Sequence, residues 1–438
     1  MQLKEITINK TNDVLYFDTL ENGLQVFMFP KQNVNTVHAS FNVKYGAMHN
    51  EFVAVGESKS NKFPNGIAHF LEHKMFEQED GIDPMLFYAQ NGADVNAYTS
   101  EYNTSYYFIS SSHLKENLEY LLDFVQTPYF TDENVEKEKG IIEEEIKMYH
   151  DDPYSYLEER VRYNGFKKHP VKYSVAGEVK DIKAITKEDL YKCYNTFYHP
   201  SNMFLVVTGN FDPEEIIGIV KENQEKKKFD KRDKVTIKKV KESDDVHKEY
   251  EEIKMNVEVP KISYGIKIPL KNIKIDPKKR DIYLSIIFNS LFGSTSIFHE
   301  LAKEKELLLS YASISTTYSD NHLFITINAD TEKVQELLEM IKETLQNIEI
   351  DDDEFENKKK LFISNNLYTL EDVDAINSNI VNNLIIYGQY ETNYDKIIRN
   401  VTKKEIEDLI KQLNFDNVSI VVINPLKKWG GNRNAKIK

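Results

Sequence analysis

The sequence has few of the features that would place it in a secreted or membrane-embedded class. Cys193 is the single cysteine among 438 residues, so no disulfide can form within the chain. Such cysteine usage is typical of a reducing compartment. Since no apolar run of about 18 or more residues occurs, no membrane span is expected. The first residues resemble no signal peptide, and the predicted location is the cytoplasm.

Positive charge and nucleotide-binding motifs are also scarce. The chain carries 56 Lys and Arg against 71 Asp and Glu, which gives a formal net charge of −15. A protein this acidic repels a phosphate backbone, so nucleic acid is not an expected partner. Cationic peptides are favoured as partners over nucleic acids. Neither a P-loop nor a G-x-G-x-x-G motif is present, so the sequence implies no nucleotide cofactor.

The chain does contain enough apolar material for a large core. It is 40% hydrophobic and includes 24 Phe and 26 Tyr, which excludes a wholly disordered chain. One stretch, residues 222–252, is strongly charged and poor in large apolar side chains. It predicts an exposed linker with a short strand at Val235–Val240, or else a solvated hairpin within one domain. The predicted division is 1–225, a linker at 226–248, and 249–438.

The two sides of this linker repeat the order strand, helix, two strands, two helices, strand. In the first half these elements are expected at Ala39–Tyr45, Gly66–Phe76, Ala93–Tyr98, Tyr106–Ser110, Leu114–Val125, Asp132–His150 and Met203–Thr208. In the second half they are expected at Ile262–Ile268, Arg280–Phe292, Tyr311–Thr317, Leu323–Asn328, Glu332–Leu345, Asp353–Leu367 and Val418–Ile423. The recurrence predicts an α+β fold made from a duplicated unit of about 200 residues.

The segment PNGIAHFLEHKMFEQ places His69, Glu72 and His73 on one stretch of helix. Residues three and four apart share a helix face, so both imidazoles project together with the carboxylate beside them. Two such histidines can take two positions around Zn²⁺, and the carboxylate can act on a water there. Apolar side chains cover the remaining directions and predict a helix buried nearly all round. The alternative is a pair of packed or exposed histidines without a metal.

The next long helix, predicted from TDENVEKEKGIIEEEIKMYHDDP, offers a third ligand. Thr131 or Asp132 is the expected N-cap. A helical period aligns one apolar stripe, composed of Val135, Ile142, Ile146 and Tyr149. Glu138 and Glu145 fall within that stripe, and a buried carboxylate requires a cation. We therefore expect Glu145 to bind the metal and Glu138 to support the site, although an acidic helix with a solvated face is the plainer alternative.

These segments resemble the inverzincin zinc peptidases, the family of pitrilysin, insulysin and the mitochondrial processing peptidase. The likeness rests on the inverted motif H-x-x-E-H, on NGADVNAYTSEYNTSYYF and YHPSNMFLVVTGNFDP, and on the acidic helix, which follow one another in one order. It is strongest to small bacterial members with one pair of domains. The resemblance implies two homologous α/β-sandwich domains of the mitochondrial-processing-peptidase type, arranged as half of a clamshell.

The resemblance also implies roles for individual residues. His69, His73 and Glu145 would bind one Zn²⁺ per chain, and Glu72 would be the general base for the attacking water. Glu138 would support the catalytic site. The peptide substrate would lie as an added strand against the segment of Asn96, Ala97 and Tyr98. From the residues alone, this segment is also explained as a plain hairpin strand.

One departure from the family concerns the second half. Members complete in one chain carry an Arg and a Tyr seven residues apart, which help hold the substrate carbonyl and the oxyanion. Here Tyr311 is present as possible oxyanion support, but Glu304 stands where the Arg is expected, and Lys303 lacks the planar fork of Arg. The chain is therefore predicted to pair with a homologous partner subunit that supplies the Arg and Tyr, or with a second copy of itself.

The sequence thus predicts a zinc-dependent endopeptidase that cleaves extended peptides, as the catalytic subunit of a heterodimer. Two other hypotheses remain open. The chain could be a zinc-bound docking or scaffold subunit without catalysis, although such a subunit has no need of a complete set of ligands. It could also be a dedicated maturation protease for one peptide precursor, which would share the mechanism and differ only in its substrate.

Overall fold

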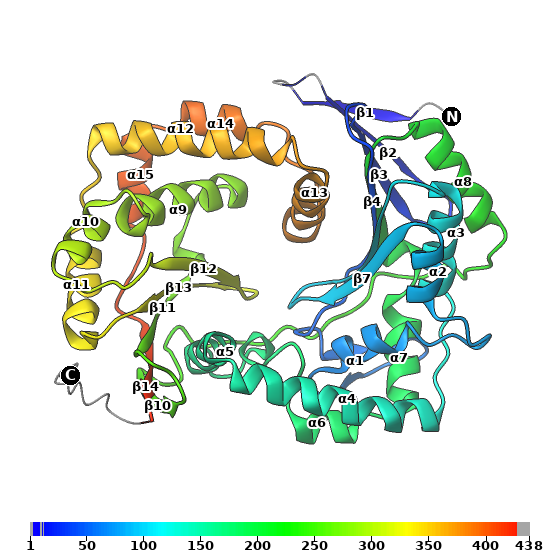
Figure 1. Cartoon of the computed structure of the whole chain (residues 1–438), viewed down its shortest axis with the longest axis horizontal. Coiled ribbons are helices and arrows are strands. Elements are labelled where there is room, and N and C mark those ends of the chain that lie inside the picture. The colour runs from blue at the N-terminus through cyan, green and yellow to red at the C-terminus, as the bar shows by residue number, and fades with distance from the viewer. Residues whose placement is uncertain (1–2, 9–10, 12, 427–438) are drawn as a thin grey trace, which may run out of the picture. The chain divides into compact units, whose positions relative to one another are not determined.

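The computed structural model describes residues 3–8, 11 and 13–426 (Figure 1). Contacts within the chain divide it into two compact units. The first unit comprises Met1–Ile146, Ser174–Lys239 and Phe362–Ile398, and the second comprises Lys147–Tyr173, Val240–Leu361 and Arg399–Lys438. Each unit combines one main β-sheet with packed helices, so the predicted α+β class is confirmed.

The first unit is built on a seven-stranded sheet with the order β1-β2-β3-β9-β4-β8-β7. Its strands are β1 Lys4–Thr7, β2 Val14–Thr19, β3 Gln25–Pro30, β4 Val37–Val43, β7 Ala93–Thr99, β8 Thr104–Ser110 and β9 Met203–Gly209. A small separate ribbon pairs β5 Glu51–Val53 with β6 Ser60–Lys62. The central strands β4 and β9 are buried along their whole length, whereas burial alternates along β7 at the sheet edge. Such alternation is typical of a strand with one solvated face.

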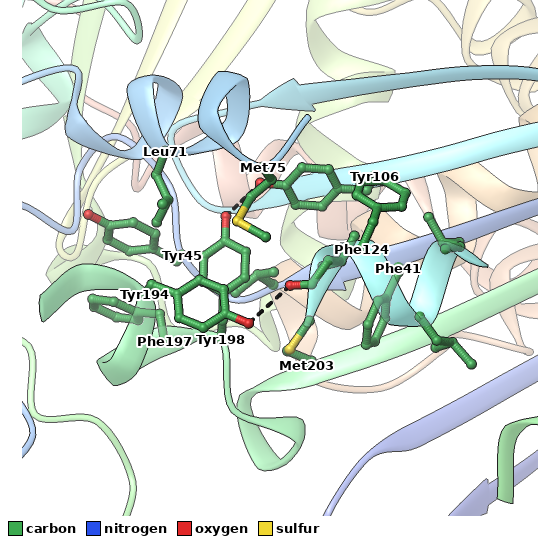
Figure 2. Packing of buried hydrophobic residues seen from close by; sticks show 14 of the residues in the cluster. Phe41, Tyr45, Leu71, Met75, Tyr106, Phe124, Tyr194, Phe197, Tyr198 and Met203 are labelled. Atoms are coloured by element: carbon green, nitrogen blue, oxygen red, sulfur yellow. Dashed lines mark hydrogen bonds between the residues drawn. The ribbon is translucent and has the colours of Figure 1, made fainter. Parts of the chain in front are cut away.

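Helices cover both faces of this sheet. The helices of the first unit are α1 Ile67–Lys74, α2 Pro84–Gln90, α3 Leu114–Val125, α6 Val179–Ala184, α7 Lys187–Phe197, α8 Pro213–Glu225 and α13 Val373–Tyr387. Side chains of α1, α3, α7 and α8 form the larger apolar core, in which the rings of Tyr45 and Phe197 stack 4.0 Å apart (Figure 2). Side chains of α13, including Ile380 and Leu384, form a second core with Phe29 and Phe204.

The second unit is built on a five-stranded sheet with the order β10-β14-β11-β13-β12. Its strands are β10 Tyr250–Met255, β11 Lys261–Pro269, β12 Ser313–Tyr318, β13 His322–Asp330 and β14 Val418–Pro425. Its helices are α5 Pro153–Gly165, α9 Pro277–Phe292, α10 Ile297–Glu304, α11 Val334–Gln346 and α15 Lys403–Ile410. Helix α5 packs its residues Leu157 and Val161 with Phe324 and Val421 of the sheet. Three further helices contain unit boundaries: α4 Asp132–Asp151, α12 Asp352–Thr369 and α14 Tyr394–Asn400.

The two units therefore exchange helices along the chain. Helix α5 lies before the charged stretch in sequence but covers the sheet that follows it, whereas α13 lies after that stretch and covers the first sheet. The predicted division at residues 226–248 stays a prediction. The predicted strand at Val235–Val240 is wrong: within it only Ile237 forms an isolated bridge, to Phe52. Its backbone exchanges two hydrogen bonds with the short β5, too few for a continuous ladder.

Within the described residues, one segment, Pro277–Glu304, is long and apolar enough by composition to cross a membrane, and its most apolar 18-residue window has a mean hydropathy of 1.2. It comprises α9 and α10, and 61% of its most apolar window is buried inside the protein. Such burial is typical of a core helix in a globular domain.

A buried ion pair fixes the charged stretch to the second unit. The Glu242 carboxylate lies 2.7 Å from Nζ of Lys267, whose side chain is fully buried. It also accepts hydrogen bonds from the backbone N–H groups of Lys167, Lys168 and His169. Burial alone would raise the pKa of Glu242, but these partners outweigh it and hold the pKa at about 2.

Glu242→Gln is expected to destabilise the chain at pH 7 by about 3–5 kcal/mol, because it leaves a buried ammonium without a counter-charge. The depressed pKa stabilises the native state above the unfolded value near 4.5, and this contribution is lost as the pH falls towards 2. Urea unfolding of both proteins between pH 7 and pH 3 would measure this. The difference in the free energy of unfolding between the wild type and Glu242→Gln, the stability gap, should narrow as the pH falls. The exposed control Glu258→Gln should have the stability of the wild type at every pH. A constant gap would contradict the prediction.

Candidate metal centre

Helix α1 begins after a glycine whose backbone conformation another residue would adopt only with strain. Gly66, the N-cap, has φ 82°, and a Cβ there would clash with the carbonyl oxygen of Ala176. From this start Phe70 and Leu71 enter the core of the first unit, so the helix is buried on nearly all sides as predicted. The apolar side chains fix the rotation of α1 and thereby the direction of its histidines.

Helix α4 brings two carboxylates to the same place. Thr131 begins it, because its Oγ1 accepts a hydrogen bond from the N–H of Asn134. The predicted stripe is buried at Val135, Ile142 and Ile146, and Glu138 is buried with it. Tyr149 was predicted in the same stripe but is 37% exposed, because it follows the last buried turn of the helix.

The structure brings together His69, His73 and Glu145. Nε2 of His69 lies 3.6 Å from Oε1 of Glu145, and Nε2 of His73 lies 3.5 Å from Oε2. One potential ligand atom from each residue lies within 4.8 Å of the others. Two imidazole nitrogens and a carboxylate are a donor set that Zn²⁺ takes in catalytic sites with an open position. The three residues therefore fit a zinc ion by chemistry and by spacing.

Glu138 prepares His73 for this role. Its Oε1 lies 2.9 Å from Nδ1 of His73, so in the neutral imidazole the carboxylate favours the proton on Nδ1 and leaves Nε2, which faces Glu145, as the nitrogen for a metal. Burial alone would lower the pKa of His73, but the hydrogen bond to Glu138 and the surrounding carboxylates raise it overall. The fully buried Lys74 lies 3.8 Å from the other oxygen of Glu138 and contacts Glu77.

Glu138→Gln is expected to weaken zinc binding by about 10–100-fold, because a neutral amide accepts the His73 Nδ1–H hydrogen bond more weakly than a carboxylate and makes the imidazole a poorer ligand. Zinc affinity measured by competition with a chromogenic chelator would test this. The control is Glu136→Gln, on the same helix, where the carboxylate pairs with Lys139 and makes no contact with the histidines. Equal zinc affinity of the two variants would contradict the role of Glu138.

Glu72 lies beside the histidines and is 7% exposed. Its Oε2 accepts a hydrogen bond of 2.6 Å from Oγ1 of Thr99, the last residue of β7. Burial raises the pKa of Glu72, which the neighbouring His69, the Thr99 hydroxyl and His73 only partly offset. A carboxyl whose pKa lies above its usual range is suited to exchange protons near neutral pH.

The predicted substrate segment forms the edge strand β7. This strand pairs with β8 on one side, and the sheet order ends with it. Asn96 and Tyr98 are exposed, and Ala97 is half-buried. The N–H of Ala97 donates a hydrogen bond of 2.8 Å to the side chain of Asn96. The backbone of β7 is thus available to an added strand, and the roles of these three residues stay a prediction.

Tyr311 belongs to the second unit, where it follows α10 and is 67% exposed. Its ring stacks on that of His299 at 4.7 Å. Its role in oxyanion support stays a prediction. Sequence reasoning missed Lys74 and Thr99 as contacts of the site. A buried lysine within the motif was a readable signal, whereas no spacing rule relates Thr99 to Glu72, 27 residues earlier.

Comparisons with known proteins agree with this geometry. The family described as insulinase, peptidase family M16, matches residues 51–179, which include all the candidate metal ligands. The family described as the peptidase M16 inactive domain matches residues 184–362. The Bacillus subtilis protein named uncharacterized zinc protease YmfH is 42% identical over 345 residues, which cover 78% of this chain and 80% of that protein.

Solved structures with the same fold include two peptidases. The crystal structure of an M16-like peptidase from Alicyclobacillus acidocaldarius is 30% identical, with a TM-score of 0.88, and covers 97% of this chain and 99% of the other. The structure of pitrilysin is 15% identical, with a TM-score of 0.73, and covers 97% of this chain but 47% of pitrilysin. The second likeness concerns the fold alone.

Proposed function

Since this chain belongs to the insulinase family of M16 peptidases, we propose that it is a zinc-dependent endopeptidase acting on extended peptides. Its membership confirms the resemblance read from the sequence. The observation that supports the proposal is the cluster of His69, His73 and Glu145, with Glu72 held beside it. Relatives with the name zinc protease support the choice of metal.

In this proposal His69, His73 and Glu145 hold the zinc ion, one per chain. A bound zinc ion acts as a Lewis acid and lowers the pKa of water. Glu72 accepts the proton of the attacking water on its free oxygen Oε1, holds it in a buried site, and returns it to the nitrogen of the leaving amine.

The substrate would bind by adding a strand to the open edge of β7. Main-chain hydrogen bonds give affinity without strict demands on sequence, and side chains beside the strand select residues at alternate positions. The Ala97 N–H is already aligned as a donor, since it bonds the Asn96 side chain, and a substrate carbonyl would replace that oxygen. We infer a preference for basic peptides from the net charge of −15.

A homologous partner subunit would complete the oxyanion site. The second unit carries Tyr311, but Glu304 on α10 stands where an Arg is expected, and the neighbouring Lys303 would be a weak substitute. Removal of one oxyanion donor typically lowers the rate by about 10²–10³-fold, so the chain alone would be a slow enzyme. The partner is a homologous subunit that supplies Arg and Tyr, or a second copy of this chain. The cytoplasmic location stays a prediction.

The proposal is tested by incubating the purified chain with a library of quenched fluorescent peptides. The assays contain zinc or a chelator, with and without the product of any neighbouring homologous gene. Cleavage that the chelator stops supports a zinc peptidase, and cleavage that needs the second chain supports the heterodimer. Stoichiometric zinc without cleavage under every condition would overturn the proposal in favour of a docking subunit.

A further inference from the structure

The carboxylate of Glu72 is held by one hydroxyl group. Within the described part of the chain, Thr99 makes the one side-chain hydrogen bond to Glu72, from Oγ1 to Oε2 at 2.6 Å. A glutamate has three rotatable side-chain bonds, so a single short hydrogen bond decides which way its carboxylate faces. With Oε2 engaged, Oε1 is the oxygen left for a proton.

The proton count assigns the direction of this hydrogen bond. Thr99 has one hydroxyl proton, and an ionised carboxylate can only accept. The hydroxyl oxygen of Thr104 lies 3.3 Å from Oγ1 of Thr99, which is farther than the Glu72 carboxylate. It donates its own proton to the carbonyl oxygen of Tyr45 at 2.9 Å. The proton of Thr99 is therefore available to Glu72.

Two buried phenol groups near Glu72 already bond each other. Tyr106 and Tyr198 are buried, and their hydroxyl groups bond each other at 2.8 Å (Figure 2). The negative charge of Glu72 lies close enough to raise the pKa of both phenols, behind the larger effect of their burial. Neither phenol bonds the carboxylate, so none of these groups can replace Thr99 without a rearrangement.

Thr99 itself stands on rigid backbone. It is the last residue of β7 and lies opposite Thr104 of β8. The turn that follows is closed by the N–H of Ser100, which donates to the carbonyl oxygen of Asn103 at 2.8 Å, and by the Ser100 hydroxyl on the Asn103 side chain. The hydroxyl that orients Glu72 is thus carried by the same edge strand to which the substrate would add.

We propose that Thr99 is a positioning residue for Glu72, through which the edge strand β7 sets the direction of the general base. This inference rests on the proposed peptidase function. The Thr99 hydroxyl contacts Glu72 and Thr104 and makes no hydrogen bond to His69, His73 or Glu145 within the described part of the chain, so its loss should act on the chemical step rather than on zinc binding.

The test compares Thr99→Val, which keeps the shape and loses the hydroxyl, with Thr99→Ser, which keeps the hydroxyl. Thr99→Val should lower kcat about 10–100-fold, because a hydrogen bond to a charged group is lost, and should change KM less than about threefold. Thr99→Ser should stay within about threefold of the wild type. Zinc stoichiometry should equal that of the wild type in both. Thr99→Ala is measured alongside, so that the result does not depend on the folding of one variant.

Thr196→Val is the matched control, because Thr196 is a buried threonine whose hydroxyl donates to the Lys192 carbonyl, accepts from the Val55 N–H and does not bond Glu72. It should lower Tm without lowering kcat. In the Glu72→Gln background, Thr99→Val should cause no further loss. Wild-type kcat in both Thr99→Val and Thr99→Ala would overturn the proposal.

A structural readout separates this proposal from the proposed function. Crystal structures of the zinc-loaded wild type and Thr99→Val should show the Glu72 carboxylate turned away from its wild-type direction in the variant. An unchanged Glu72 carboxylate would overturn the role of Thr99, whether or not the enzyme is active. Absence of chelator-sensitive cleavage by the wild type would instead overturn the peptidase function and leave the crystallographic test in force.

Discussion

Glu72→Gln is expected to lower kcat for peptide hydrolysis by about 10³-fold and to leave one zinc ion per chain. The amide has nearly the shape of the carboxylate and can still accept the hydrogen bond from Thr99, so the helix and the ligands should stay in place. It cannot take up a proton from water near neutral pH. Steady-state hydrolysis of a cleaved peptide and elemental analysis of the same preparation would measure both quantities.

The matched control for this change is Glu79→Gln, which makes the same substitution seven residues later on an exposed side chain. It should keep the kcat, the zinc content and the Tm of the wild type. If Glu72→Gln retained more than about a tenth of the activity, Glu72 could not be the general base. If it lost zinc as well, the loss of activity would reflect the metal site rather than proton transfer.

The sequence predicts most of the site because most of it is local. His69, Glu72 and His73 lie within one helical turn, and a period of 3.6 residues places Glu138 and Glu145 on the buried stripe of α4. The structure agrees with both patterns and brings the two helices together. A helical pattern says which residues share a face, and the fold then brings the two faces into contact.

The sequence fails where contacts depend on the fold. Helices α5 and α13 each cover the sheet on the other side of the charged stretch, and no periodicity predicts which sheet an amphipathic helix will meet. The contact of Thr99 with Glu72 depends on how the end of β7 meets α1. Tyr149 shows a prediction of burial that is wrong. It is in register with the apolar stripe of α4, but it is exposed because the helix has passed its last packed turn.

The carboxylates of this site differ in pKa because their surroundings differ. Glu138 has a lowered pKa, because bonding to His73 and the nearby Lys74 outweigh its burial, so it stays ionised and holds the imidazole. Glu72 has a raised pKa, because burial outweighs its neighbours, so it can exchange a proton. The same two helices therefore supply one carboxylate that keeps its charge and another that can give it up.

Glu145→Gln is expected to remove zinc from the purified chain, with an affinity more than about 100-fold below that of the wild type. The two carboxylate oxygens of Glu145 face Nε2 of His69 and Nε2 of His73, and a neutral amide is a far weaker zinc ligand. The loss should exceed that of Glu138→Gln, because a direct ligand is removed rather than its support. Zinc content after dialysis and the zinc concentration needed to restore hydrolysis would measure it.

The control for this variant is the next residue back along α4. Glu144 is exposed, and Glu144→Gln removes the same charge from the same turn without facing the histidines. It should bind zinc as the wild type does. A difference in zinc affinity between the two variants would then come from the position of the carboxylate and not from the loss of one negative charge. Stoichiometric zinc in Glu145→Gln would contradict the ligand set. In that event the two imidazoles would hold the ion without the Glu145 carboxylate.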